Sequence, residues 1–229
     1  MVLEDAAQGF LSKYKGKFLG TLGNMAAISF HETKNIISGE GGALIINNRK
    51  FEERAEIIWE KGTNRSKFMK GQVDKYTWVD IGSSYLPGEI IAAFLYAQLE
   101  KAFEITKKRI AIWNKYHIKL ESLEKNGFIS RPYIPNYCEH NGHLYYILVR
   151  KQELRDKLIQ FLKDRGIQSV FHYIPLHSSL AGKKYARFTG DMRITNKTSS
   201  SLVRLPLFYD ITDEEIAYVA KSIYDFFRK

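Results

Sequence analysis

Residues 28–43, ISFHETKNIISGEGGA, carry a single lysine, Lys34, in a short polar loop between two apolar runs. The runs, residues 25–30 and 43–46, are short and rich in Ile, Ala and Leu, which predicts buried strands rather than helices. Glycines beside the loop allow the backbone to bend or to approach a ligand closely. Two interpretations stay open at this point: a hairpin tip with a solvated lysine, or a lysine placed for amine chemistry.

The length and composition are those of an ordinary soluble globular protein. The 229 residues suffice for one large domain or two small ones, with 45% hydrophobic and 26% charged residues. There is no apolar run of about 20 residues and no signal-peptide pattern, so we expect a cytoplasmic protein without membrane contact. The single cysteine, Cys138, excludes an intramolecular disulfide and is compatible with a reducing compartment.

The formal net charge of +10 makes nucleic-acid binding a class to consider. The basic residues are scattered through helical stretches and alternate with Glu, as in residues 100–109, and the sequence has no dense basic tract. Solvated helix faces account for most of this charge, and a polyanionic small ligand such as a nucleotide sugar can use the rest. We therefore expect no nucleic-acid partner.

Local patterns predict the organisation of the first part of the chain. The run Val2–Leu3 predicts the end of a buried strand that delivers Asp5 to a site. Residues 51–61 have helical spacing, and residues 63–86 predict a long loop, whose aromatic residues favour an ordered rather than a disordered one. These aromatic residues are Tyr76, Trp78 and Tyr85. Residues 89–126 contain no Pro or Gly and predict a helix long enough to connect two domains.

Beyond Gly127 the pattern alternates between strands and helices, which predicts a small α/β domain. The strands are expected at 143–149 and 169–173, and the helices at 153–165, 195–202 and 212–227. Thr212 and Glu215 have the spacing of a capping box at the start of the last helix. The predicted organisation is a large domain at 1–86, a long interdomain helix at 87–126 and a small domain at 127–229.

Three further groups of residues suggest other chemistry. Cys138, His140 and His143 lie close together in the sequence, but a structural zinc site normally has four ligands, and no second pair follows. We therefore predict no metal site. His177 follows a proline in an extended segment, where it is expected to face a ligand. Glycines 39, 41 and 42 lack the spacing of a nucleotide-binding P-loop.

Several separated motifs together resemble one known family. Residues 4–8 (EDAAQ), residues 29–35 (SFHETKN) and residues 39–42 (GEGG) resemble the cofactor region of the DegT/StrS-type sugar aminotransferases. Three longer stretches strengthen this resemblance, which covers essentially the whole chain: residues 55–66, 73–86 and 170–177. The resemblance implies a pyridoxal-phosphate enzyme with an α/β fold of type I, like that of aspartate aminotransferase. It also implies that an N-terminal part of the large domain, with a phosphate-binding turn and a ring-stacking aromatic residue, is lacking.

The resemblance implies a role for each matching residue. Lys34 would form the Schiff base with pyridoxal 5'-phosphate and then act as general acid and base in the 1,3-proton shift. Asp5 would pair with the pyridine nitrogen, Gln8 would bond near the phenolic oxygen, and Ser29 would donate to the phosphate. Ser84 stands where the family often has an asparagine that reaches the phosphate of the partner subunit. The expected substrate contacts are His31, Tyr85 and His177.

The resemblance also implies an activity and partners. The enzyme would move an amino group from L-glutamate to the C4 ketone of dTDP-4-dehydro-6-deoxy-D-glucose, in cell-surface polysaccharide biosynthesis. It would act as a homodimer with sites at the subunit interface, or with a separately encoded N-terminal part. The alternative is a catalytically incompetent or regulatory fragment of such an enzyme.

Overall fold

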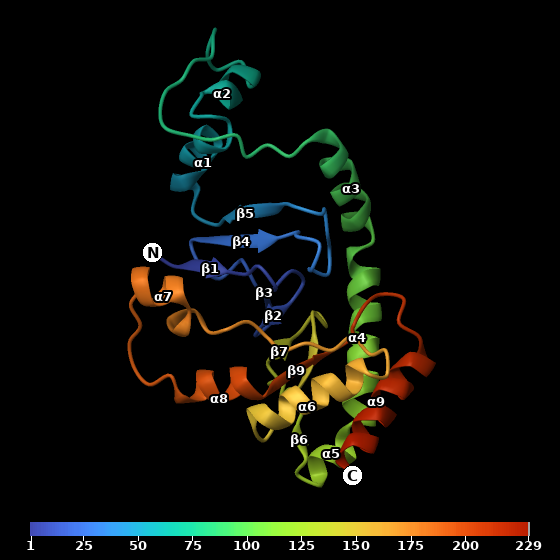
Figure 1. Cartoon of the computed structure of the whole chain (residues 1–229). Helices are drawn as coiled ribbons and strands as arrows, with labels where there is room; N and C mark the ends of the chain where they lie inside the picture. Colours follow the sequence, from blue (N-terminus) through green and yellow to red (C-terminus); the bar gives the residue numbers. More distant parts are fainter. Residues whose placement is uncertain (229) are drawn as a thin grey trace. The chain divides into compact units, whose positions relative to one another are not determined.

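The computed structural model describes residues 1–228, which form two compact units (Figure 1). Unit 1 comprises residues 1–106 together with 136–141, and unit 2 comprises residues 107–135 and the chain from Gly142 onward. The sequence predicts a division on either side of one long helix. In the structure the boundary between the two units falls inside that helical stretch, and the short segment 136–141 belongs to unit 1.

A three-stranded sheet forms the centre of unit 1, in the order β1-β4-β5. Its strands are β1 (Leu3–Asp5), β4 (Met25–Ser29) and β5 (Gly42–Ile46). β1 is parallel to β4, with Asp5 opposite Ala27, and β5 is antiparallel to β4. The prediction that the apolar runs on either side of Lys34 are strands is therefore confirmed, but the predicted burial is wrong for the second run, because no residue of β5 is buried.

The two faces of this sheet differ in burial. Ala26 and Ile28 point to one face and pack in an apolar cluster that includes Ile36, which is 1% exposed. The opposite face leaves Leu44 exposed. Burial of the Val2–Leu3 run was predicted and is wrong, because these side chains are 60% and 59% exposed. The reason is that β1 lies at the edge of the sheet, where only β4 pairs with it.

A second, smaller sheet in unit 1 joins segments that are far apart in the sequence. It consists of β2 (Lys13–Tyr14), β3 (Lys17–Phe18) and β7 (Cys138–Glu139), in the order β3-β2-β7. An ion pair of 3.0 Å between Lys13 Nζ and Glu139 Oε2 joins β2 to β7. The segment 136–141 is therefore built into unit 1 by both backbone and side-chain contacts.

The residues after β5 form short helices and an irregular but connected segment. The helices are η1 (Arg49–Phe51), α1 (Glu52–Trp59) and α2 (Arg65–Met69). The loop at 63–86 is fixed mainly by its backbone, because Gly62 O accepts hydrogen bonds from the N–H groups of Val79 and Asp80. A Cβ atom at Gly62 would lie 2.0 Å from the carbonyl oxygen of Asp80, so this close approach requires glycine.

The aromatic residues of this loop are largely exposed. Tyr76 is 52% exposed, Trp78 is 78% exposed and Tyr85 is 64% exposed. The ring of Tyr76 contacts that of Phe68, with centroids 5.5 Å apart, and backbone hydrogen bonds hold the rest of the loop.

Most of the stretch 89–126 is helical, as predicted, but it forms three helices instead of one continuous helix. It consists of α3 (Glu89–Glu100), α4 (Ala102–Lys119) and α5 (Glu121–Lys125). The interruptions fall at Lys101 and Leu120, whose ψ angles are 5° and 3°. Hydrogen bonds with helical spacing are still made at both positions, from Ile105 N–H to Lys101 O and from Leu120 N–H to Tyr116 O. The three helices therefore follow one another directly, and neither interruption contains proline or glycine.

Unit 2 contains an antiparallel sheet in the order β6-β8-β9. Its strands are β6 (Ile129–Ser130), β8 (Tyr145–Val149) and β9 (Leu202–Leu205). The helices are α6 (Gln152–Lys163), η2 (Leu176–Ser178), α7 (Leu180–Tyr185), α8 (Arg193–Ser201) and α9 (Asp213–Phe227). The capping box predicted at Thr212 and Glu215 is confirmed, with hydrogen bonds of 2.8 and 3.2 Å.

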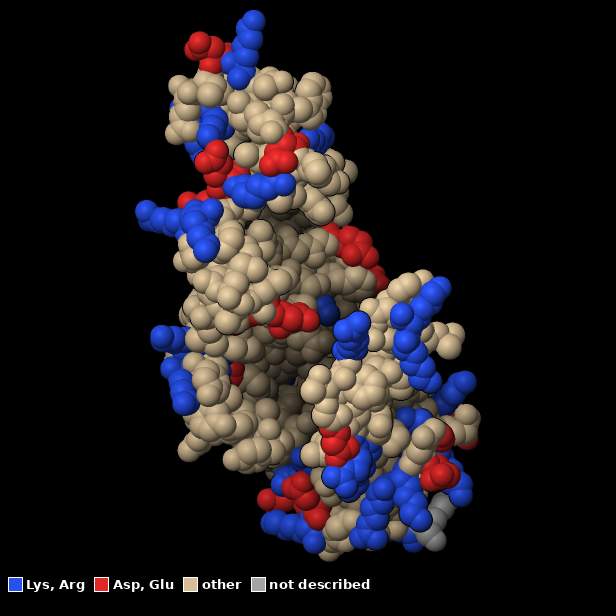
Figure 2. Space-filling model, turned by 90° about the vertical axis from the view of Figure 1, so that its left-hand side faces the viewer, with Lys and Arg blue, Asp and Glu red and all other residues tan. Residues whose placement is uncertain are grey.

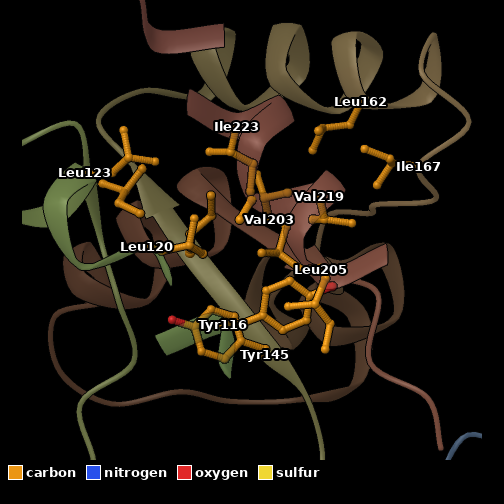
Figure 3. Close-up of a cluster of buried hydrophobic side chains, with 14 of the residues drawn as sticks. Tyr116, Leu120, Leu123, Tyr145, Leu162, Ile167, Val203, Leu205, Val219 and Ile223 are labelled. Carbon is orange, nitrogen blue, oxygen red and sulfur yellow. The ribbon is translucent and has the colours of Figure 1, made fainter. Parts of the chain in front are cut away.

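The core of unit 2 lies where helices cover this sheet (Figure 3). Figure 3 shows Tyr116 and Tyr145 beside each other, and their rings stack with centroids 5.3 Å apart. Leu158 and Leu162 of α6 are 0% exposed and lie four residues apart, on one face of the helix. Helical spacing in the sequence and burial in the structure therefore agree for α6.

One strand predicted in this half is wrong. Residues 169–173 do not form a strand, and only Val170 pairs with Arg204 in an isolated bridge. After this pair the chain leaves the sheet, and Phe171 and Tyr173 are exposed. The apolar and aromatic composition of the segment favoured a strand, but no neighbouring strand continues far enough to pair with it.

Charged side chains of both signs are distributed over the surface, as Figure 2 shows for one face. Many basic groups have an acidic partner nearby, for example Arg54 with Asp80 at 2.7 Å and Lys70 with Glu56 at 2.8 Å. This distribution agrees with the interpretation of the positive charge as solvated helix faces. Within residues 1–228, no helix combines the length and apolar character needed to cross a membrane.

The buried face of α6 can be tested by truncation. We expect Leu158→Ala to lower the free energy of unfolding by about 2–5 kcal/mol, because the fully buried side chain leaves a cavity. Lys157→Ala is the matched control on the exposed face of the same helix and is expected to change the stability by less than about 0.5 kcal/mol. Denaturant unfolding followed by circular dichroism measures both. Equal effects of the two changes would contradict the assignment of the buried face.

Candidate active site

Asp5 and Ser29 lie at the same edge and on the same face of the unit 1 sheet. β1 and β4 are parallel, so their carboxyl ends meet at one edge. Asp5 is opposite Ala27, and Ser29 follows two residues later, so both side chains point to the outer face. The Asp5 carboxylate accepts a hydrogen bond of 3.2 Å from Ala7 N–H. The strand pairing therefore places an acceptor carboxylate and a hydroxyl beside each other in an accessible position.

Lys34 lies in the loop that leads from β4 to β5, directly after this edge. Its backbone N–H donates to His31 O at 2.9 Å, which closes a tight turn. Among the residues that the structure describes, none hydrogen-bonds or ion-pairs with its Nζ atom. Ile36, two residues later, is 1% exposed. The backbone at Lys34 is thus held while its amine is available.

The second half of this loop is held by Ser38 and by two glycines. Ser38 is 3% exposed, and its Oγ donates to Phe30 O at 3.2 Å and to Glu40 O at 2.9 Å. A Cβ atom at Gly41 would lie 2.5 Å from Ser38 Oγ, and one at Gly42 would lie 2.7 Å from Ile28 O. The glycines therefore allow close backbone approach, as the sequence predicts.

Gln8 and His31 flank the same edge. Gln8 lies in the turn after β1, and its backbone oxygen accepts a hydrogen bond of 2.8 Å from Asn141. His31 Nδ1 lies 3.1 Å from Thr33 N, which donates to it, and His31 Nε2 lies 3.6 Å from Glu40 Oε1. The roles of both residues toward a cofactor or substrate stay predictions.

The other residues predicted for the site have contacts of their own. Ser84 pairs with Glu60 in an isolated antiparallel bridge, and Tyr85 N–H donates to Trp59 O. Neither hydrogen-bonds Asp5, Ser29 or Lys34 in the described part of the chain. His177 belongs to unit 2, where its Nε2 lies 2.9 Å from Asn196 Oδ1. Their roles stay predictions.

The structure adds Glu4, which sequence analysis did not single out. Its carboxylate accepts hydrogen bonds from the N–H groups of Gly20, Leu22 and Gly23, at 2.9, 2.6 and 2.6 Å. Desolvation raises the pKa of this carboxyl group, but the three donors outweigh it and hold the pKa below its ordinary value. Glu4 thus fixes the turn before β4. One feature of the sequence could have indicated Glu4: side chains alternate along a strand, so Glu4 points inward if Asp5 points outward.

Sequence analysis also did not identify Asn35 and Asn141 as residues near the site. Asn35 is 9% exposed and donates through Nδ2 to Asn141 O at 2.8 Å. Sequence proximity to Lys34 could have indicated Asn35. No local pattern indicates Asn141, because its partners lie more than 100 residues away in the chain.

The fold is that of the pyridoxal-phosphate-dependent aminotransferases. A DegT DnrJ EryC1 StrS aminotransferase from Brucella abortus matches with a TM-score of 0.84 and 26% identity, over 99% of this chain and 57% of that chain. The pyridoxal-phosphate form of Spr1654, a putative sugar aminotransferase from Streptococcus pneumoniae, matches with a TM-score of 0.81 and 23% identity, over 98% and 57%.

The chain belongs to the DegT/DnrJ/EryC1/StrS aminotransferase family, whose model matches residues 1–224. GDP-perosamine synthase of Escherichia coli O157:H7 is 30% identical over 228 residues, which is 99% of this chain and 58% of that protein. This chain therefore spans a little over half of the length of such relatives. The family uses pyridoxal phosphate and acts in nucleotide-sugar and polysaccharide biosynthesis.

The role of Glu4 can be tested by acid titration. We expect Glu4→Gln to lower the stability of unit 1 by about 1–2 kcal/mol at neutral pH, because it removes a charged acceptor of three N–H groups. Since the folded pKa is lowered, the contribution is present above the unfolded pKa of about 4.3 and is lost as the pH falls through the folded pKa. Wild type and variant should therefore converge in acid.

Denaturant unfolding between pH 3 and pH 7 measures this convergence. Glu32→Gln is the control, because it removes the same charge from an exposed position. A constant difference between wild type and Glu4→Gln over this pH range would count against the assigned role.

Proposed function

We propose that this chain supplies the lysine-bearing part of a pyridoxal-phosphate-dependent aminotransferase site. The observation that carries the proposal is the arrangement around the β1–β4 edge. Asp5 supplies a carboxylate, Ser29 a hydroxyl and Lys34 an amine. No described residue hydrogen-bonds or ion-pairs with this amine. Membership in the aminotransferase family supports the same conclusion.

The chemistry of these groups fits the cofactor. The Asp5 carboxylate faces outward with one local hydrogen bond, so it can pair with a protonated pyridine nitrogen. The Ser29 hydroxyl would donate to the phosphate, and the amine of Lys34 would hold the aldehyde carbon through a covalent bond that forms with loss of water. When bound, the cofactor supplies an electron sink for the carbanion formed at the amino-bearing carbon.

In this proposal Lys34 also moves the proton. A primary amine released from the cofactor can accept a proton from one carbon and return it to another. The turn closed by Lys34 N–H and His31 O holds the backbone, so only the side chain needs to move between these positions. Gln8 would bond near the phenolic oxygen, and Ser84 would act on the phosphate in the partner subunit. His31, Tyr85 and His177 are proposed to contact the substrate.

We propose that the substrate is a nucleotide-linked 4-keto-6-deoxy sugar, specifically dTDP-4-dehydro-6-deoxy-D-glucose, with L-glutamate as amino donor. The sugar product would be dTDP-4-amino-4,6-dideoxy-D-galactose. Support comes from the sequence resemblance of residues 55–66, 73–86 and 170–177 and from the role of the family in nucleotide-sugar biosynthesis. The net charge of +10 suits a ligand that carries a diphosphate.

We further propose that the protein acts as a homodimer, with or without a separately encoded part that completes the fold. The outer side of α3 supports self-association. Ile90, Phe94 and Tyr96 are 85%, 50% and 66% exposed, and exposed apolar surface of this kind marks interaction sites.

Cofactor binding tests the central proposal. We expect wild type mixed with pyridoxal phosphate to show a shifted absorbance band, and borohydride reduction to fix the cofactor on the peptide that contains Lys34. Lys34→Ala should abolish both signals, because the amine that forms the covalent link is absent. Lys50→Ala, which removes another lysine from unit 1, should leave them unchanged.

Absence of the band in wild type at saturating cofactor would overturn the enzyme proposal for this chain. The chain would then be a catalytically incompetent or regulatory fragment of the family. Labelling at a lysine other than Lys34 would overturn the assignment of the site.

The dimer proposal has its own test. We expect Ile90→Asp to shift a dimer to monomers in sedimentation velocity, because a charge in an apolar interface is desolvated without a partner. Leu180→Asp is the control, since Leu180 is also strongly exposed, at 90%, but lies in unit 2. A monomeric wild type, or dissociation by both changes alike, would reject α3 as the interface.

A further inference from the structure

The turn at Lys34 is anchored through its neighbour Asn35. The Asn35 side chain is 9% exposed and donates through Nδ2 to the backbone oxygen of Asn141 at 2.8 Å. Ile36 adds a second anchor, because it packs in the apolar cluster of unit 1. The residues that follow Lys34 are therefore fixed by one polar and one apolar contact.

The side chain of Asn141 binds the other segment of the site. Asn141 is 5% exposed, and its Nδ2 donates to Gln8 O at 2.8 Å and to Phe10 O at 2.9 Å. Both carbonyl groups belong to the turn that follows Asp5. One residue thus joins the segment after Asp5 to the turn that carries Lys34. We call these contacts of Asn141 with Gln8, Phe10 and Asn35 the Asn141 clasp.

The chemistry of the clasp is specific to an amide. Each of the two amide hydrogens of Asn141 has its own carbonyl acceptor. A carboxylate of the same shape would place negative charge against these oxygens, and an alanine would leave both carbonyls without this donor. The segment itself does not depend on the clasp, because β7 pairs with β2 and Glu139 pairs with Lys13.

We propose that Asn141 is a positioning residue that sets where Lys34 lies relative to Asp5. This inference rests on the proposed function, since the distance matters only if both residues hold one cofactor. The two groups would act at different atoms of that cofactor, the carboxylate on the ring nitrogen and the amine on the aldehyde carbon. Their spacing must therefore match the ring, and displacements of about 1 Å are enough to cost about a hundredfold in rate.

Amide hydrogen exchange without cofactor tests the clasp itself. The probes are hydrogen-bonded amides in the two segments: Gly9 and Ser12 in one, Lys34 and Ser38 in the other. We expect Asn141→Ala and Asn141→Asp to raise exchange at Gly9 and Ser12 by about tenfold, because they remove the amide that binds Gln8 O and Phe10 O. Asn35→Ala should raise exchange at Lys34 and Ser38, because it removes the donor to the Asn141 backbone oxygen, while amides in β4 and β5 keep their protection. Asn136→Ala is the matched control, because it removes an exposed amide from the same segment. Unchanged exchange at either pair of probes would overturn the clasp.

Cofactor absorbance then tests positioning. We expect both Asn141 variants to keep the band that depends on Lys34 but to shift the pH midpoint of its absorbance, because Asp5 and Lys34 no longer hold the ring together. The control Asn136→Ala should leave the midpoint unchanged, and a merely structural role of Asn141 would also leave it unchanged. If wild type binds cofactor and the variants keep its midpoint, positioning is overturned and the proposed function stands. If wild type binds no cofactor, the proposed function fails, and positioning toward a cofactor fails with it.

Discussion

Parallel pairing of β1 with β4 is the constraint on which the site depends. It brings Asp5 and Ser29 to one edge and one face of the sheet. A slip of one residue would turn one of them toward the apolar cluster, because side chains alternate along a strand. Glu4 opposes such a slip, since its inward carboxylate binds three N–H groups in the turn before β4. The residue that fixes the register thus lies beside the residue that faces the site.

The loop at Lys34 combines a fixed backbone with a free amine. Ser38 and Ile36 are almost fully buried, and Gly42 lets β5 approach β4 closely. Among residues 1–228, none hydrogen-bonds or ion-pairs with the amine of Lys34. Such an arrangement lowers the entropy that a reacting group must lose, which is how a rigid scaffold favours catalysis.

The two units differ in how they are stabilised. Among the described residues, nineteen form the buried apolar cluster of unit 2, and only six form that of unit 1. Unit 1 has less apolar burial to hold its loops, so polar contacts such as those of Glu4 and Asn141 carry more of that task. Apolar side chains on the outer sheet face and on α3 are exposed.

By its resemblance to a family, the sequence implied that Asp5, Ser29 and Lys34 belong to one site. By itself it determined the strands on either side of Lys34 and the helices α6 and α9. These features follow from local periodicity, capping and short motifs, which act over a few residues. The tertiary structure decided that Val2–Leu3 is exposed, that residues 169–173 form no strand, and that Asn141 joins two segments of the site. Each of these depends on which distant segment supplies a neighbour, and local pattern does not contain that information.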